Sequence, residues 1–173
     1  MNHRERMAPA PTARESSAWE ALARVEDPEI PVLNLVDLGV IRFVRTRPDA
    51  TLEVGLSSTY SGCPATEVIR RSVERALEAA QVGPFSIIGA LAPPWSSDWI
   101  SAEGRRKLAA HGIAPPAQAL LSPRRVLHAD RPAACPRCNS ANTESVSEFG
   151  STPCKALYRC RECLEPFEYF KCI

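Results

Sequence analysis

The stretch Thr59-Tyr60-Ser61-Gly62-Cys63-Pro64-Ala65-Thr66-Glu67 lies where a strand-like run ends and a helix-like run begins. Gly62 permits a tight turn, and Pro64 suits the first position of a helix, where its missing N–H is not needed. Cys63 would then lie at or near the N-cap, where the helix dipole lowers the pKa of a thiol and favours a nucleophilic or metal-binding thiolate. A buried structural cysteine is the alternative, because free cysteines are commonly buried.

Hydrophobic spacing on both sides of this stretch predicts a series of helices and strands. Helices are expected at residues 16–25, 64–81 and 101–112, and strands at residues 40–44, 51–56 and 85–91. Ser16 or Ser17 caps the first helix. Ser101 caps the last, in which Leu108 points inward and Lys107 mostly outward. The first two strands form an antiparallel hairpin, and the whole predicts an α+β domain in which helices cover a small sheet.

The composition of the 173-residue chain is that of a globular protein without a dominant charge. Hydrophobic residues make up 45% of it, enough for a packed core. A net charge of +1 and an aromatic content of 6% favour neither a nucleic-acid nor a membrane partner. No signal peptide or membrane-spanning run is visible, so we expect a cytoplasmic protein. In that reducing compartment, cysteines are metal ligands or reactive thiols rather than disulfides.

Four segments are expected along the chain. They are a flexible arm (1–15), the helix-covered sheet (16–112), a linker rich in proline, alanine and arginine (113–133), and a cysteine-rich unit (134–173). A short strand at residues 125–128 is the one element expected in the linker.

The cysteine-rich unit contains two C-x-x-C pairs, Cys135–Cys138 and Cys160–Cys163. Each pair turns two sulfurs toward one metal, and two such pairs complete a tetrahedral site, which predicts a zinc ribbon. A closed four-thiolate zinc site is structural, and in a unit this small it contributes folding energy. The sequence does not separate zinc from iron or an iron-sulfur cluster. Cys154 and Cys172 are either buried small residues or extra thiols able to hold metal.

The chain resembles the MIP-type domain of iron-sulfur assembly factors in three motifs: Asp27-Pro28-Glu29-Ile30-Pro31, Asp37-Leu38-Gly39 and Ser61-Gly62-Cys63-Pro64. Later stretches at residues 92–95, 149–160 and 165–172 narrow the resemblance to the PaaD (PaaJ) family, small proteins encoded with the phenylacetyl-CoA ring epoxidase. The resemblance covers residues 18–173.

The resemblance implies an accessory protein, not an enzyme, of aerobic phenylacetate breakdown. It would help to assemble or deliver iron or iron-sulfur centres to the epoxidase, a di-iron oxygenase, or to its iron-sulfur reductase. Its partners would be those subunits. The cysteine and aspartate of the family's pocket correspond to Cys63 and Asp37, with Thr59 and Glu67 as neighbours. The expected cofactors are Zn²⁺ in the ribbon and transient iron or a cluster at Cys63.

Two other functions stay open. A structural subunit of the oxygenase complex would leave Cys63 merely buried. An enzyme would use Cys63 as a nucleophile or redox thiol with Asp37, although no histidine lies near either residue in the sequence. No Glu-x-x-His pair, G-x-G-x-x-G motif or P-loop is present. The sequence also leaves a homodimer open.

Overall fold

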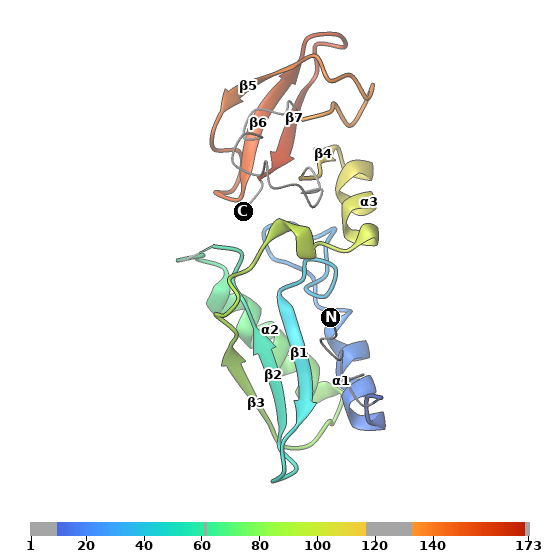
Figure 1. Ribbon diagram of the computed structural model, residues 1–173, viewed down its shortest axis with the longest axis vertical. Helices are drawn as coiled ribbons and strands as arrows, with labels where there is room; N and C mark the ends of the chain where they lie inside the picture. The colour runs from blue at the N-terminus through green and yellow to red at the C-terminus, as the bar shows by residue number, and fades with distance from the viewer. Residues whose placement is uncertain (1–9, 61, 117–132, 172–173) are drawn as a thin grey trace, which may run out of the picture.

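The computed structural model describes residues 10–60, 62–116 and 133–171, which form two sheets placed one above the other (Figure 1). Among the described residues, the lower sheet has three strands and the upper sheet four. Two α-helices accompany the lower sheet, a third lies beside the upper one, and the cysteine-rich end of the chain forms most of the upper sheet. The protein is therefore an α+β chain, as the sequence predicts.

The lower sheet consists of β1 (Ile41–Thr46), β2 (Leu52–Leu56) and β3 (Phe85–Gly89). β1 and β2 are antiparallel, which confirms the predicted hairpin, whereas β3 runs parallel to β2. Every residue of the central strand β2 is buried. A parallel neighbour requires a crossover connection, and the helix between β2 and β3 provides it.

The helices are α1 (Ala13–Leu22), α2 (Thr66–Ala79) and α3 (Ala102–Ala110), with a short 3-10 helix at Ser97–Trp99. α2 is strongly amphipathic and buries Ile69, Val73 and Leu77. α3 begins after Ser101, whose hydroxyl accepts a hydrogen bond from the Gly104 N–H at 2.8 Å, so the predicted cap is confirmed.

The first helix begins earlier than expected, which shortens the arm. Its N-cap is Thr12, not Ser16 or Ser17, because Thr12 and Glu15 form a reciprocal capping box. Glu15 also accepts the Thr46 N–H of β1 at 2.7 Å. Arg14 donates to three backbone carbonyls, including that of Pro84 at 2.6 Å. Residues 12–15 are thus anchored to the sheet rather than part of a free arm.

The upper sheet is a ribbon of β5 (Thr143–Ser147), β6 (Lys155–Cys160) and β7 (Pro166–Phe170), joined at one edge by β4 (Ile113–Ala114). β4 runs parallel to β7, so the first two residues of the expected linker belong to the ribbon's sheet. The strand expected at residues 125–128 lies outside the described residues, as does Cys172. Within the described residues, no helix is long and apolar enough to span a membrane.

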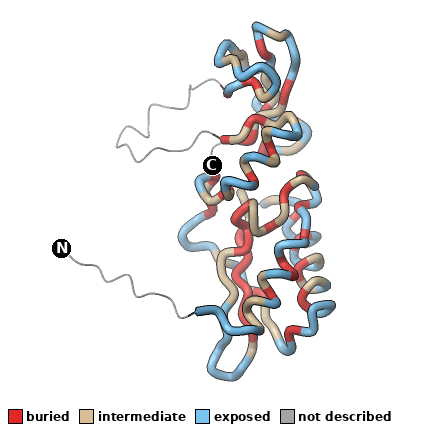
Figure 2. Tube along the Cα trace, turned by 90° about the vertical axis from the view of Figure 1, so that its right-hand side faces the viewer, coloured by how far each residue is buried: buried red, intermediate tan, exposed pale blue. Residues whose placement is uncertain are grey.

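The main hydrophobic core continues from the lower sheet into the ribbon. Figure 2 shows buried residues concentrated along the middle of the lower half. The same buried cluster includes Cys154 and Phe170, both from the ribbon. Phe170 packs on Trp95 with ring centroids 6.1 Å apart. The two sheets therefore share a core, and a site at their junction can draw residues from both.

Candidate functional site

A cavity opens between the ribbon and the lower domain, that is, the lower sheet with α1, α2 and the segment before β1. Its volume is about 420 Å³ when its opening to solvent is included. Its walls come from the segment before β1, the end of β2 and the following turn, α2, and the ribbon. The chemically reactive side chains on these walls are two thiols and two carboxyl groups, those of Cys63, Cys154, Asp27 and Glu29. This collection of metal-binding groups makes the cavity the candidate functional site.

Cys63 lies in the turn before α2 and is half-buried. Gly62 adopts a φ of +83°, as the predicted tight turn requires. The helix begins at Thr66 with Ala65 as its N-cap, so Cys63 is not the cap and Pro64 is not the first helical residue. Instead, the Cys63 carbonyl accepts hydrogen bonds from the N–H and Oγ1 of Thr66, at 3.2 and 2.9 Å.

Cys154 approaches the cavity from the ribbon, just before β6. It is 3% exposed, and its Sγ lies 3.1 Å from Thr152 Oγ1. Burial raises the pKa of the Cys154 thiol. The sequence left its role open between a packed side chain and an extra thiol. The structure shows it buried in the core and facing the cavity with Cys63.

Asp27 and Glu29 supply the two carboxyl groups. Asp27 is buried, and its Oδ1 accepts the backbone N–H groups of Glu29 and Ile30, each at 2.9 Å. Burial raises the pKa of Asp27. Burial also raises the pKa of Glu29, and the nearby charge of Asp27 raises it further. Their motif carries part of the family resemblance, but neither residue was predicted as a site residue. The signal available in the sequence was the motif's acidic pair.

The Tyr60 hydroxyl is buried and has no hydrogen-bond partner of normal geometry among the described residues. Burial, and then the Cys63 thiol, raise the pKa of Tyr60 to about 12, with smaller contributions from Glu29 and Cys154. The phenol is therefore protonated at neutral pH. It places an O–H donor close to the thiols, without a hydrogen bond of normal geometry to any described residue.

Of the other predicted pocket residues, the structure brings only Thr59 to the cavity. Glu67 lies exposed on α2, where it forms an ion pair with Arg71 at 3.2 Å, one helical turn away. Glu67 is not among the described residues that line the cavity, because the first turn of α2 points its side chain into solvent.

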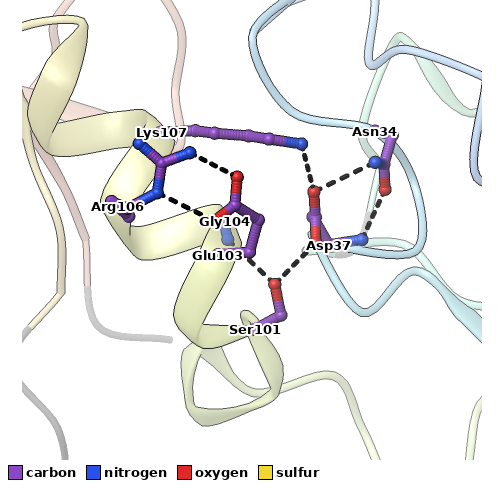
Figure 3. Close-up of polar contacts among 7 residues, drawn as sticks. All are labelled: Asn34, Asp37, Ser101, Glu103, Gly104, Arg106 and Lys107. Carbon is purple, nitrogen blue, oxygen red and sulfur yellow. Dashed lines mark hydrogen bonds and ion pairs between the residues drawn. The ribbon is translucent and has the colours of Figure 1, made fainter.

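Asp37 belongs to a different polar cluster, at the start of α3 (Figure 3). Its carboxylate accepts hydrogen bonds from Asn34 Nδ2 at 3.0 Å and Ser101 Oγ at 2.7 Å, and it pairs with Lys107 Nζ at 2.6 Å. Burial acts against ionisation, but Lys107 and the two neutral donors outweigh it and lower the pKa of Asp37.

This arrangement corrects two expectations. Lys107 turns toward Asp37 instead of into solvent. Asp37 does not line the cavity with Cys63, because its oxygens are taken up by the cap and first turns of α3. Its geometry is that of a residue that holds α3 against the segment before β1.

The second site is the four-cysteine cluster of the ribbon. The sulfurs of Cys135, Cys138, Cys160 and Cys163 all lie within 4.8 Å of one another. Two of the separations are 3.7 Å (Cys135 to Cys163) and 3.5 Å (Cys138 to Cys160). Four sulfurs bound at roughly 2.3 Å to one tetrahedral ion are roughly 3.8 Å apart, so the cluster fits a closed four-thiolate metal site. The predicted ligand set is thus brought together.

Two family models match this chain. The PaaD zinc beta ribbon domain matches residues 122–171, and the iron-sulfur cluster assembly protein model matches residues 15–83. A putative 1,2-phenylacetyl-CoA epoxidase subunit of Escherichia coli (strain K12) is 42% identical over 171 residues, covering 98% of this chain and 99% of that protein. The chain belongs to the PaaD family. This PaaD-family membership confirms the resemblance seen in the sequence.

Two further proteins are similar to about half of this PaaD-family chain. The Fe-S protein maturation auxiliary factor of Porphyromonas gingivalis (strain ATCC BAA-308 / W83) is 35% identical over 95 residues, covering 54% of this chain and 90% of that protein. A crystal structure of a domain of unknown function, DUF59, from Bacillus anthracis superposes with a TM-score of 0.51 at 26% identity. It covers 56% of this chain and 92% of its own.

Proposed function

We propose that this protein is an accessory maturation factor of a phenylacetyl-CoA epoxidase, which passes iron or an iron-sulfur centre to the oxygenase or its reductase. Cys63 is the transfer ligand. The observation that carries this proposal is the position of Cys63, half-buried on the wall of a cavity lined by metal-binding groups. The similarity to an Fe-S maturation factor and to a putative epoxidase subunit supports the same role.

The geometry favours metal handling over catalysis by Cys63. The cavity lacks the cysteine–histidine pair of many thiol nucleophiles, because no histidine lines it in the described part of the chain. The groups around Cys63 are instead a second thiol, two carboxyl groups and a phenol. A half-buried thiol among such groups can take up an iron atom and release it to a partner's stronger ligands.

The test is epoxidase maturation in cells whose only copy of this protein carries Cys63→Ser. We expect the oxygenase complex to accumulate but to lack activity and iron, while the purified variant keeps its fold and its ribbon metal. A matched control is Thr66→Ser. Thr66 lines the same cavity, and a serine there keeps a hydroxyl next to the Cys63 carbonyl. Wild-type activity in the Cys63→Ser cells would contradict the proposal.

The ribbon metal in this proposal is zinc, held by Cys135, Cys138, Cys160 and Cys163. The sulfur spacing fits it, and the matching family model is that of a zinc ribbon. Zinc there would close the ribbon and supply no open coordination position. Metal and sulfide analysis of anaerobically purified protein should give one zinc and no sulfide per chain.

A structural component of the oxygenase complex is the second candidate, favoured because the Escherichia coli relative is named as an epoxidase subunit. It predicts stable co-purification at fixed stoichiometry, with activity that tolerates Cys63→Ser. The maturation role predicts transient association that is absent from the finished complex. Size-exclusion chromatography of the active complex distinguishes the two.

A further inference from the structure

The cavity is lined by two thiols that come from distant parts of the chain. Cys63 belongs to the turn before α2, and Cys154 to the start of the ribbon's β6 hairpin. Phe170 of β7 lines the same cavity and is 1% exposed. The ribbon therefore forms one wall of the cavity, and it places a thiol there that the lower domain alone does not have.

Carboxylate oxygens complete the set of hard and soft donors. Asp27 has one oxygen engaged by two backbone N–H groups, which fixes its orientation. Glu29 is half-buried, and its carboxyl group makes no hydrogen bond or ion pair with the other described residues. A half-buried acceptor without a partner in a cavity is available to a ligand.

Among the described residues, the cation that acts on these donors is Lys155, whose charge works against the raised pKa of Asp27, Glu29 and Cys154. Lys155 is 4% exposed and already pairs with Glu168 Oε2 at 2.7 Å. The buried Tyr60 hydroxyl makes no hydrogen bond of normal geometry with the described residues, and it lies close enough to Cys63 for that thiol to raise its pKa. Such a donor can bond to a metal-bound thiolate or sulfide, and bonds of this kind stabilise thiolate-bound iron.

We propose that Cys63 and Cys154 bind one iron species together, with the Glu29 carboxylate as a third ligand and the Tyr60 hydroxyl as a donor to the bound sulfur. The species is a ferrous ion or the exposed iron of a [2Fe–2S] cluster. Both present a thiophilic iron with open positions. Binding displaces the two thiol protons and involves no change of oxidation state. This inference deepens the proposed function and rests on it, because it names the second ligand and assigns its supply to the ribbon.

The arrangement also accounts for release. Within the described residues, only the four ribbon cysteines hold three or more such donor atoms within 4.8 Å of one another. The cavity donors must close in by side-chain rotation when iron enters, which costs binding energy. A site of this kind binds iron more weakly than a preformed site such as the ribbon's binds its metal. Weak binding suits iron that is to be released to a partner.

The test uses the full-length protein with its ribbon metal in place, titrated anaerobically with Fe²⁺ alone. Cobalt(II) serves as a second probe, because sulfur-to-cobalt absorption reports thiolate ligation. We expect Cys154→Ser to weaken binding by about tenfold or more, as Cys63→Ser does, and the double variant to bind more weakly than either, because it keeps neither thiolate ligand. Glu29→Gln should weaken it less, and the exposed neighbour Glu26→Gln should have no effect. Sulfide analysis after cluster reconstitution separates a ferrous ion from a cluster.

A second measurement uses the wild-type protein and therefore needs no folded variant. Phenylarsine oxide bridges two thiols that can approach each other. One equivalent added to the wild-type protein should protect both Cys63 and Cys154 from alkylation, as read by peptide mass spectrometry. The ribbon cysteines stay protected throughout by their metal.

The outcomes separate this inference from the proposed function. If Cys154→Ser binds iron like the wild type and the arsenical protects neither thiol, the thiol pair is refuted. Loss of binding and of maturation with Cys63→Ser would then leave the proposed function standing. If Cys154→Ser abolishes iron binding while Cys63→Ser cells retain full epoxidase activity, the site exists and the proposed function fails.

Discussion

The rings of Trp95 and Phe170 pack with their centroids 6.1 Å apart, across the junction of the two sheets. The Trp95 indole N–H donates to the Leu38 carbonyl at 3.1 Å, which fixes the ring on the lower domain. Phe170 ends β7 and also lines the cavity. This contact holds the ribbon, and with it Cys154, at the position from which it faces Cys63.

Replacing Phe170 should therefore destabilise both units at once. Phe170→Ala should lower the free energy of unfolding by about 3–5 kcal/mol, since it leaves a cavity in the shared core. Phe149→Ala is the matched control, because that ring is 63% exposed, and it should change stability by no more than about 0.5 kcal/mol. Urea denaturation checks both. Equal effects would show that the two sheets do not share a core.

Removing the ribbon metal should propagate to the lower domain. The ribbon's own buried cluster contains only Ala114, Ala133, Cys135, Cys160 and Phe167 among the described residues. Structural zinc contributes on the order of 10 kcal/mol to folding in small domains, so a chelator should unfold the ribbon. Phe170 would then leave Trp95, and the tryptophan fluorescence should change together with a fall in Tm. Added zinc should restore both. Unchanged fluorescence after complete metal removal would contradict the coupling.

The Asp37 cluster should make the free energy of unfolding depend on pH in the acidic range. The pKa of Asp37 is lowered from its ordinary value of 3.8, so its stabilisation is fully present above that value and is lost as the pH falls through the lowered pKa. At pH 7, Asp37→Asn should cost about 1–3 kcal/mol, because it removes charged hydrogen bonds to Lys107 and Ser101. The difference from the wild type should shrink in acid.

Glu103→Gln is the control for Asp37. Its carboxylate pairs at 2.6 Å with Arg106 on the exposed face of the same helix. Surface pairs of this kind contribute little, so stability should change little at any pH. Thermal unfolding followed between neutral and acidic pH compares the two variants. A constant difference between Asp37→Asn and the wild type at all pH values would refute the role of ionised Asp37.

Gly39 is required where the chain turns into β1. Its φ is +73°, and a Cβ there would lie 2.7 Å from the Trp99 carbonyl oxygen. Gly112 has a φ of +78° but open space around it. Both substitutions by alanine incur the left-handed strain of about 1–2 kcal/mol, and Gly39→Ala adds a backbone clash. We expect Gly39→Ala to be the more destabilising in urea denaturation. Equal losses would mean that Trp99 moves aside freely.

Local patterns predicted the elements well, because each depends on residues close in the chain. The Ser101 cap, the β1–β2 hairpin and the turn at Gly62 are of this kind. The cap predicted at Ser16 or Ser17 was wrong, although the correct one has a local signal too. Thr12 and Glu15 have the three-residue spacing of a capping box.

The site residues divide in the same way. The four ribbon cysteines followed from their C-x-x-C spacing, since each pair is brought together by its own turn. The family pattern predicted Asp37 beside Cys63. In the structure, Asp37 forms an ion pair with Lys107 of α3, which lies far along the chain. No local pattern encodes that contact.

The sequence by itself therefore determined the ribbon ligands, the order of the elements and the presence of Cys63 before a helix. Only the tertiary structure decided that Cys154, Asp27 and Glu29 share a cavity with it. The reason is physical. Sulfur ligands in a knuckle are positioned by the few bonds between them, whereas the cavity is formed by the packing of two sheets through Trp95 and Phe170.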